Sequence, residues 1–235
     1  MSTYQTIIYA LLGGVVPAIV WLTFWLREDS KRPEPKGRLL ETFLAGMLAV
    51  IIVLPIQKVV ASSFPGLGFV PFLLWATTEE ILKFFAAYLT ALRTRDDDEP
   101  VDNLIYMITV ALGFAALENV LFIWNPLLNQ DVSLALSTGS LRFVGASLLH
   151  VVTSSAVGLG LAFAFYKSRG RKILFGLIGL SLAIAFHTAF NLFILNQTGA
   201  DTFKTFAVVW FGIAVLLWSF EVVKKIAPPL KRDII

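Results

Sequence analysis

Six side chains that can carry acid–base or metal chemistry lie inside stretches of the chain that are otherwise apolar. They are Glu79, Glu80, Lys83, Glu118, His150 and His187. An ionised side chain near the centre of a bilayer costs about 2.5–3.5 kcal/mol on insertion scales, so such residues usually mark a functional site. Carboxylates and imidazoles together can activate water by acid–base catalysis. Two histidines and one carboxylate are also a ligand set of catalytic zinc.

Each of these residues also has a structural interpretation. Glu79 and Lys83 are four residues apart on one predicted helix and can neutralise each other. A single histidine in a membrane helix often only bonds to a neighbouring helix. At a rise of 1.5 Å per residue, however, the charged groups and histidines of four successive helices fall about 9–15 Å below the same membrane boundary. This common depth favours one convergent site.

The elements that must position these residues are membrane helices. Of the 235 residues, 57% are hydrophobic and 15% are charged, against about 25% charged residues in soluble domains. Apolar runs of about 20 residues predict seven spans, at 5–26, 39–60, 69–92, 102–124, 141–166, 172–196 and 204–223. We expect an all-α fold, a polytopic membrane helix bundle that forms a single domain over residues 1–235. Its site-bearing helices cover about 69–196, and the protein lies in the cell membrane as a multi-pass protein.

The basic residues predict the orientation of this bundle. Fifteen of the 19 Lys and Arg residues fall in alternate connections and the C-terminal tail, within 27–38, 93–95, 167–172 and 224–232. Lys58, Arg142 and Lys204 lie near helix ends on the other side, and Lys83 lies within a span. Because cytoplasmic loops carry the excess of positive charge, the C-terminus is expected in the cytoplasm and the N-terminus outside. Topology thus accounts for the net charge of +3, and no nucleic-acid partner is expected.

Four short motifs, each on its own predicted helix, give the chain a resemblance to a known family. They are Glu79-Glu80-x-x-Lys83 in WATTEEILKF, Phe114-x-x-x-Glu118-Asn119 in GFAALENVLF, His150 at the start of HVVTSSAVGLG, and His187-x-x-x-Asn191 in HTAFN. With these motifs the chain resembles the PrsW family of intramembrane proteases, which is grouped with CAAX prenyl endopeptidases and Abi proteins. Relative to the CAAX-type pattern, Lys83 replaces a later arginine and Glu118 stands where that group has a histidine.

The resemblance implies hydrolysis of a peptide bond within or near the membrane, with these roles. Glu79 is the general base on water, and Glu80 is its partner or the proton donor to the leaving amine. Lys83 keeps one carboxylate ionised, and Asn119 orients Glu118. Glu118, His150 and His187 bind a metal or, if no metal is present, water or substrate. His187 and Asn191 lie on one helix face and point toward the scissile carbonyl. Thr77, Thr78, Ser154 and Ser155 are interpreted as helix-packing residues.

Several alternatives stay open at this point. Zinc is the expected cofactor if a metal is bound, but a metal-free, glutamate-type protease of the CAAX kind also fits. A proton- or ion-coupled transporter builds relays from the same residue types, although transporters usually show repeats and broken helices. A scaffold or receptor does not need a buried carboxylate pair. The expected partners are the bilayer and a membrane-anchored protein substrate; the resemblance suggests an anti-sigma factor, cut near its outer face.

Overall fold

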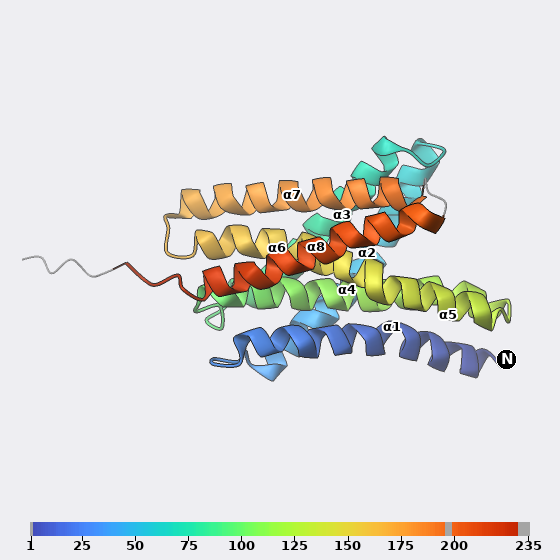
Figure 1. The fold of residues 1–235 in the computed structure, drawn as a ribbon, viewed down its shortest axis with the longest axis horizontal. Coiled ribbons are helices and arrows are strands. Elements are labelled where there is room, and N and C mark those ends of the chain that lie inside the picture. The colour runs from blue at the N-terminus through green and yellow to red at the C-terminus, as the bar shows by residue number, and fades with distance from the viewer. Residues whose placement is uncertain (1, 196–198, 230–235) are drawn as a thin grey trace, which may run out of the picture.

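The computed structural model describes residues 2–195 and 199–229, which form helices joined by short connections, without a strand in these ranges. Most of the helices run roughly along one long axis, and helices joined by a connection alternate in direction (Figure 1). In chain order they are α1 (Thr3–Trp25) with the 3₁₀ turn η1 (Leu26–Asp29), α2 (Lys36–Ser63), α3 (Phe69–Ala87) with the π-turn η2 (Tyr88–Leu92), α4 (Pro100–Leu128), α5 (Val132–Leu141) with the π-turn η3 (Arg142–Ala146), α6 (Ser147–Phe163), α7 (Arg169–Leu195) and α8 (Gly199–Val223).

These elements form seven long helices, because α5, η3 and α6 follow one another without a break. Six of the seven are long and apolar enough to cross a membrane. The seventh, α3 with η2, covers the predicted span 69–92 and differs from the others by its three charged residues within the apolar run, Glu79, Glu80 and Lys83. The predicted all-α bundle of about seven helices is confirmed. The fifth span was placed too late, because the helix begins at Val132 rather than at 141.

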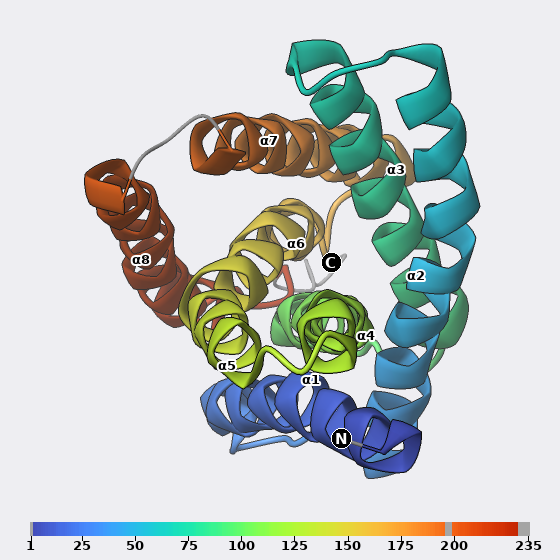
Figure 2. The ribbon, with the colours of Figure 1, turned by 90° about the vertical axis from the view of Figure 1, so that its right-hand side faces the viewer.

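Helix α4 forms the centre of the bundle. Figure 2 shows α1, α2 and α6 around it, and α4 packs against all three. Its residues from Val101 to Ala116 are buried without exception. Helix α3 and helix α7 pack against each other on the side of α6 and α2, away from α1. Because α4 is surrounded by other helices, the polar groups that it carries are held away from lipid.

Two glycines let α2 and α4 approach at backbone distance. A Cβ atom on Gly46 would collide with the carbonyl oxygen of Val110, and a Cβ atom on Gly113 would collide with that of Phe43. Small residues at such crossings allow close van der Waals packing, which drives helix association in lipid. The contact fixes α2 beside α4 and therefore the position of the residues that α2 presents toward α3.

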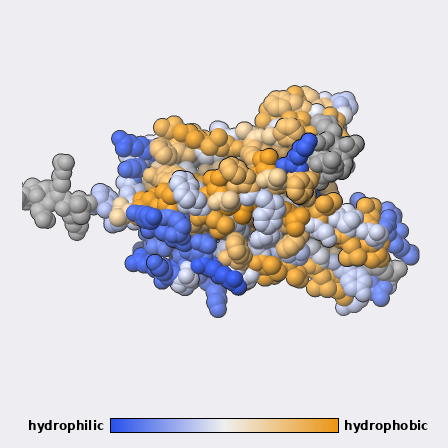
Figure 3. Space-filling view, in the orientation of Figure 1, coloured by the Kyte–Doolittle hydropathy of each residue, from blue (hydrophilic) through white to orange (hydrophobic). Residues whose placement is uncertain are grey.

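The surface of the bundle is that of a membrane protein. Large apolar side chains such as Leu48, Ile51, Leu177 and Trp218 are 55–68% exposed, and apolar residues cover most of the visible face (Figure 3). Hydrophilic residues gather at the end where α1, η2, α6 and α8 finish. A soluble protein does not expose apolar surface on this scale. The protein is therefore a multi-pass membrane protein, as predicted.

Candidate active site

The charged residues and histidines predicted to converge do lie together in the structure. Glu79, Glu80 and Lys83 project from α3, and His150 and His187 meet them from α6 and α7. All five side chains are at most 5% exposed. Glu118 of α4 joins the group through His150 and is more open to the exterior. The site is thus assembled from four helices that are distant in sequence.

Glu80 is the most heavily bonded residue of the group. Its Oε1 accepts hydrogen bonds from Lys83 Nζ at 2.6 Å and from Thr153 Oγ1 at 3.0 Å. Ser154 Oγ donates to the other oxygen, Oε2, at 3.4 Å. His187 Nδ1 lies 2.7 Å from Oε1. A carboxylate that receives this many donors is stabilised in its ionised form and has little capacity left for a substrate.

The contact with Glu80 also orients His187. An ionised carboxylate only accepts hydrogen bonds, so the proton of the neutral imidazole resides on Nδ1 and the lone pair on Nε2. His187 Nε2 lies 3.7 Å from Glu79 Oε2. A carboxylate behind one ring nitrogen is the usual partner of a histidine whose other nitrogen binds a metal or a substrate.

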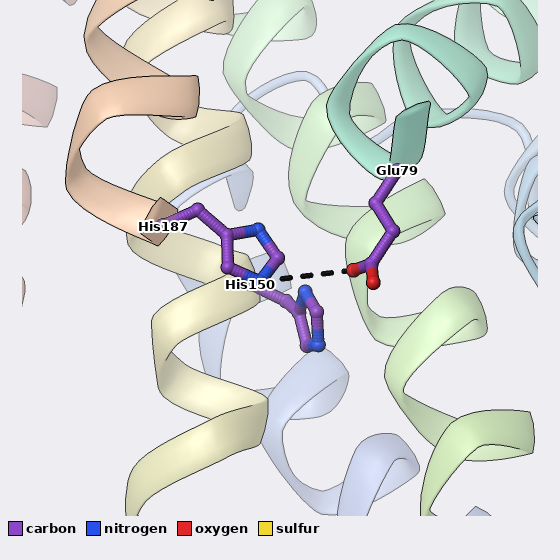
Figure 4. A group of neighbouring side chains, drawn as sticks. All are labelled: Glu79, His150 and His187. Atoms are coloured by element: carbon purple, nitrogen blue, oxygen red, sulfur yellow. Dashed lines mark ion pairs between the residues drawn. The ribbon is translucent and has the colours of Figure 1, made fainter. Parts of the chain in front are cut away.

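Glu79 differs from Glu80 in having a free oxygen. Gln57 Nε2 of α2 donates to Glu79 Oε1 at 2.7 Å, while Glu79 Oε2 is buried and has no hydrogen-bond partner among the described residues. In Figure 4, Glu79, His150 and His187 point toward one another from three helices, and the dashed line marks the His187–Glu79 pair. A buried carboxylate oxygen without a partner is costly, which indicates a position for water, a proton or a cation.

His150 connects the carboxylate pair to Glu118. Its Nδ1 lies 3.1 Å from Lys83 Nζ and its Nε2 lies 3.0 Å from Glu118 Oε2. A lysine ammonium can only donate, so Nδ1 accepts and Nε2 carries the proton toward Glu118. Asn119 was predicted to orient Glu118, and the structure places Arg142 between them. Arg142 pairs with Glu118 and donates from Nε to Asn119 Oδ1 at 2.6 Å.

A cavity of about 450 Å³ opens onto this group. Its polar lining comes from α2, α3, α4, η3, α6 and α7, and consists of Gln57, Glu79, Glu118, Arg142, His150, His187 and Asn191. Aromatic and aliphatic side chains such as Phe72, Trp75 and Phe190 form the rest. Glu80 and Lys83 do not line it. Glu79 therefore reaches the cavity, whereas Glu80 lies behind His187.

The residues present fit a metal ion. Glu79, His150 and His187 each offer one donor atom within 4.8 Å of the other two, and the set matches that of catalytic zinc. The sequence prediction has Glu118 as the carboxylate of this set, and the group found among the described residues contains Glu79 instead. A metal on His150 Nε2 would take the place of the proton that this atom shares with Glu118.

Four contributing residues were not singled out from the sequence. Arg142 was interpreted as a basic residue near a helix end, and Ser154 as a packing residue. Gln57 and Thr153 were not singled out as contributors. For Gln57, the signal in the sequence was a polar side chain inside an apolar span. The contacts of these residues join positions that are 22 to 74 residues apart in the chain, so the sequence alone did not indicate which residues pair.

Comparisons with known proteins identify the family of the chain. Residues 34–218 match the PrsW family of intramembrane metalloproteases. The chain is 33% identical over 161 residues to Protease PrsW of Geobacillus kaustophilus (strain HTA426), covering 67% of this chain and 68% of that protein. For Protease PrsW of Bacillus subtilis (strain 168) the identity is 32% over 159 residues, with 67% of each chain covered. For that of Clostridioides difficile (strain 630) it is 24% over 222 residues, or 91% and 88%.

No solved structure matches the chain. The family match covers more than half of the residues and includes all four helices that form the site. The chain therefore belongs to the PrsW family of intramembrane metalloproteases and is a peptidase.

Proposed function

We propose that this protein is an endopeptidase that hydrolyses a peptide bond of a membrane-anchored protein close to the extracytoplasmic side of the bilayer. The observation that carries the proposal is the buried, unpaired Glu79 Oε2, which faces His187 Nε2 at 3.7 Å beside an open cavity. A water molecule between these atoms and a scissile carbonyl would have a base on one side and a polarising group on the other.

The residues of the site divide the reaction between them. Glu79 Oε2 accepts the proton of water, because Gln57 holds only its other oxygen. Glu80 and Lys83 stay fixed, with Glu80 holding the His187 ring so that Nε2 faces the cavity. Asn191 is one helical turn from His187 and lines the same cavity, so its amide donates to the carbonyl oxygen of the substrate.

His150 and His187 would hold the family's metal, with zinc as the ion we propose. Glu118 is the proposed third donor, as the sequence predicts: its Oε2 lies 3.0 Å from His150 Nε2 and Arg142 pairs with it. In this structure Glu79, and not Glu118, has a donor atom within 4.8 Å of one from each histidine, so Glu118 would have to move toward His187 to complete the set. When bound, such an ion lowers the pKa of water and polarises a carbonyl group. In the alternative assignment Glu79 is the third metal ligand and Glu118 is not. The zinc content of the Glu79→Gln and Glu118→Gln variants distinguishes the two assignments. A metal-free reaction would rely on Glu79, His187 and Asn191 alone.

The substrate is proposed to approach from the outer half of the membrane. The basic connections share one end of the bundle with the end of α8 (Figure 1), and positive charge marks the cytoplasmic end. By the resemblance stated above, an anti-sigma factor with one membrane span is the proposed substrate. The relatives named above are proteases, so a transporter function is not favoured.

Co-expression tests both the activity and the substrate. Tagged single-span proteins are produced with the wild-type chain or with Glu79→Gln, and their fragments are followed by immunoblotting. A fragment that forms only with the wild-type chain supports the proposal. If Glu79→Gln produces the same fragment in the same amount, Glu79 is not the residue that activates water.

A further inference from the structure

A second group of acidic side chains lies where the end of α1 meets the start of α4, away from the active site. Asp29 closes η1, Glu99 precedes α4, and Asp102 is in its first turn. One oxygen of each carboxylate lies within 4.8 Å of one from each of the others. Glu118 lies sixteen positions after Asp102 on α4, which corresponds to about 24 Å of helix.

Two of these carboxylates keep a buried oxygen without a partner. Asp29 is 4% exposed and Asp102 is fully buried, yet no N–H or hydroxyl group of the described residues donates to Asp29 Oδ2 or Asp102 Oδ1. The side chains in hydrogen-bond contact with these two carboxyl groups are themselves acidic: Glu99 for Asp29 and Glu34 for Asp102. The remaining oxygen of Asp102 accepts from the backbone N–H groups of Asp98 and Glu99 at 2.7 Å each. The backbone thus fixes Asp102 in place while leaving Oδ1 available.

The protein supplies little positive charge to this group. Among the ion pairs of described residues, the one that reaches it joins Arg32 Nη1 and Glu99 Oε2 at 3.6 Å, and the Arg32 side chain is 72% exposed. Exposed pairs of this kind contribute about 0–1 kcal/mol. The nearby carboxyl of Glu34 is also buried and bonds to Tyr106, so it adds an acidic group rather than a cation.

We propose that Asp29, Glu99 and Asp102 bind one divalent cation that prefers oxygen ligands, Mg²⁺ or Ca²⁺. The group contains carboxylates and neither histidine nor cysteine, which suits a hard cation rather than zinc. The ion would link the end of η1 to the first turn of α4, and this site is separate from the active site.

Binding is measured by equilibrium dialysis of the purified full chain with Ca²⁺ or Mg²⁺ after treatment with a chelator. The His187→Ala background weakens the active-site group, so that ions bound there do not obscure the result. We expect about one ion per chain. Asp29→Asn lowers the affinity at least tenfold, and the matched control Asp98→Asn, an exposed carboxylate of the same connection, leaves it unchanged.

Thermal denaturation gives a second readout. Saturating Ca²⁺ or Mg²⁺ raises the Tm of the His187→Ala chain and of the Asp98→Asn control by on the order of 5 °C, and does not raise that of Asp29→Asn. Should Asp29→Asn fail to fold, Glu99→Gln removes a more exposed ligand and takes its place. The proposal is overturned if the chain binds neither ion saturably at millimolar concentration, or if binding survives in both Asp29→Asn and Glu99→Gln.

Discussion

Glu79 and Glu80 are neighbours in the chain, but their carboxylates have different surroundings. Glu80 faces Lys83, Thr153, Ser154 and His187 and is fully enclosed. Glu79 has a single donor, Gln57, and one free oxygen beside the cavity. We therefore propose different roles for these two adjacent residues: Glu80 keeps the site in shape, and Glu79 is available for chemistry.

This difference predicts that the two glutamates contribute unequally to stability. Glu80→Gln leaves Lys83 as a buried cation without its carboxylate, so it should destabilise the protein by about 3–5 kcal/mol and also reduce cleavage. Glu79→Gln replaces a buried carboxylate whose Oε2 accepts no hydrogen bond from the described residues, so thermal stability should stay near that of the wild type. Thermal denaturation of the two purified variants checks this, and equal losses of stability would contradict the separation of roles.

The zinc content of purified variants distinguishes a glutamate that binds the metal from a glutamate that acts as the general base. If Glu118 is the third donor, Glu118→Gln and His187→Ala should lose zinc, whereas Glu79→Gln should keep about one zinc per chain. Elemental analysis of the purified variants measures this directly. A Glu79→Gln protein without zinc, beside a Glu118→Gln protein that retains it, would make Glu79 the donor. Wild-type protein that is free of metal and fully active would exclude any metal role.

At the scale of helices, the site depends on how closely α2 can approach α4. Gly113 lies against the backbone of Phe43, with no room for a side chain. Gly113→Val should therefore push the helices apart and destabilise the protein by about 1–3 kcal/mol, and it should lower activity because α2 carries Gln57. Gly37→Ala is the matched control, since nothing lies within 4 Å of its Cβ position. Similar thermal stability of the two variants would contradict the proposed crossing.

The sequence predicted the bounds of a membrane helix where an apolar run begins and ends clearly. The span 69–92 coincides with α3 and η2, because a charged trio inside an apolar run leaves its ends clear. The start at Val132 was missed, since Asp131 caps a helix whose first turns contain several serines. Packing between helices determines which histidine nitrogen faces which carboxylate. The π-turn η3 determines how Arg142 pairs with Glu118. Neither feature can be read from the pattern of residue types along the sequence.

At the scale of the whole molecule, the ends of the bundle differ in charge. The connection between η2 and α4 and the connection between α6 and α7 lie at one end, and the connection between α4 and α5 lies at the other (Figure 1). Because positive charge is retained in the cytoplasm, we expect the second end to face outward, and with it the mouth of the active site.

The chain has no cysteine, so single cysteines report topology without background. In intact cells, Asn129→Cys should react with a membrane-impermeant maleimide, and Asp98→Cys should react only after the membrane is permeabilised. Both positions are exposed in the structure. The reverse pattern would invert the bundle and place the cleavage site on the cytoplasmic half.

The most direct test of the account is the cleavage rate of Glu79→Gln with a single-span substrate, after co-reconstitution of both proteins in liposomes. Glu79→Gln keeps the shape of the side chain and removes the base, so the rate should fall about 10²–10⁴-fold, with zinc content and thermal stability near those of the wild type. A variant that still cleaves at more than about a tenth of the wild-type rate would contradict the claim that Glu79 activates water in this site.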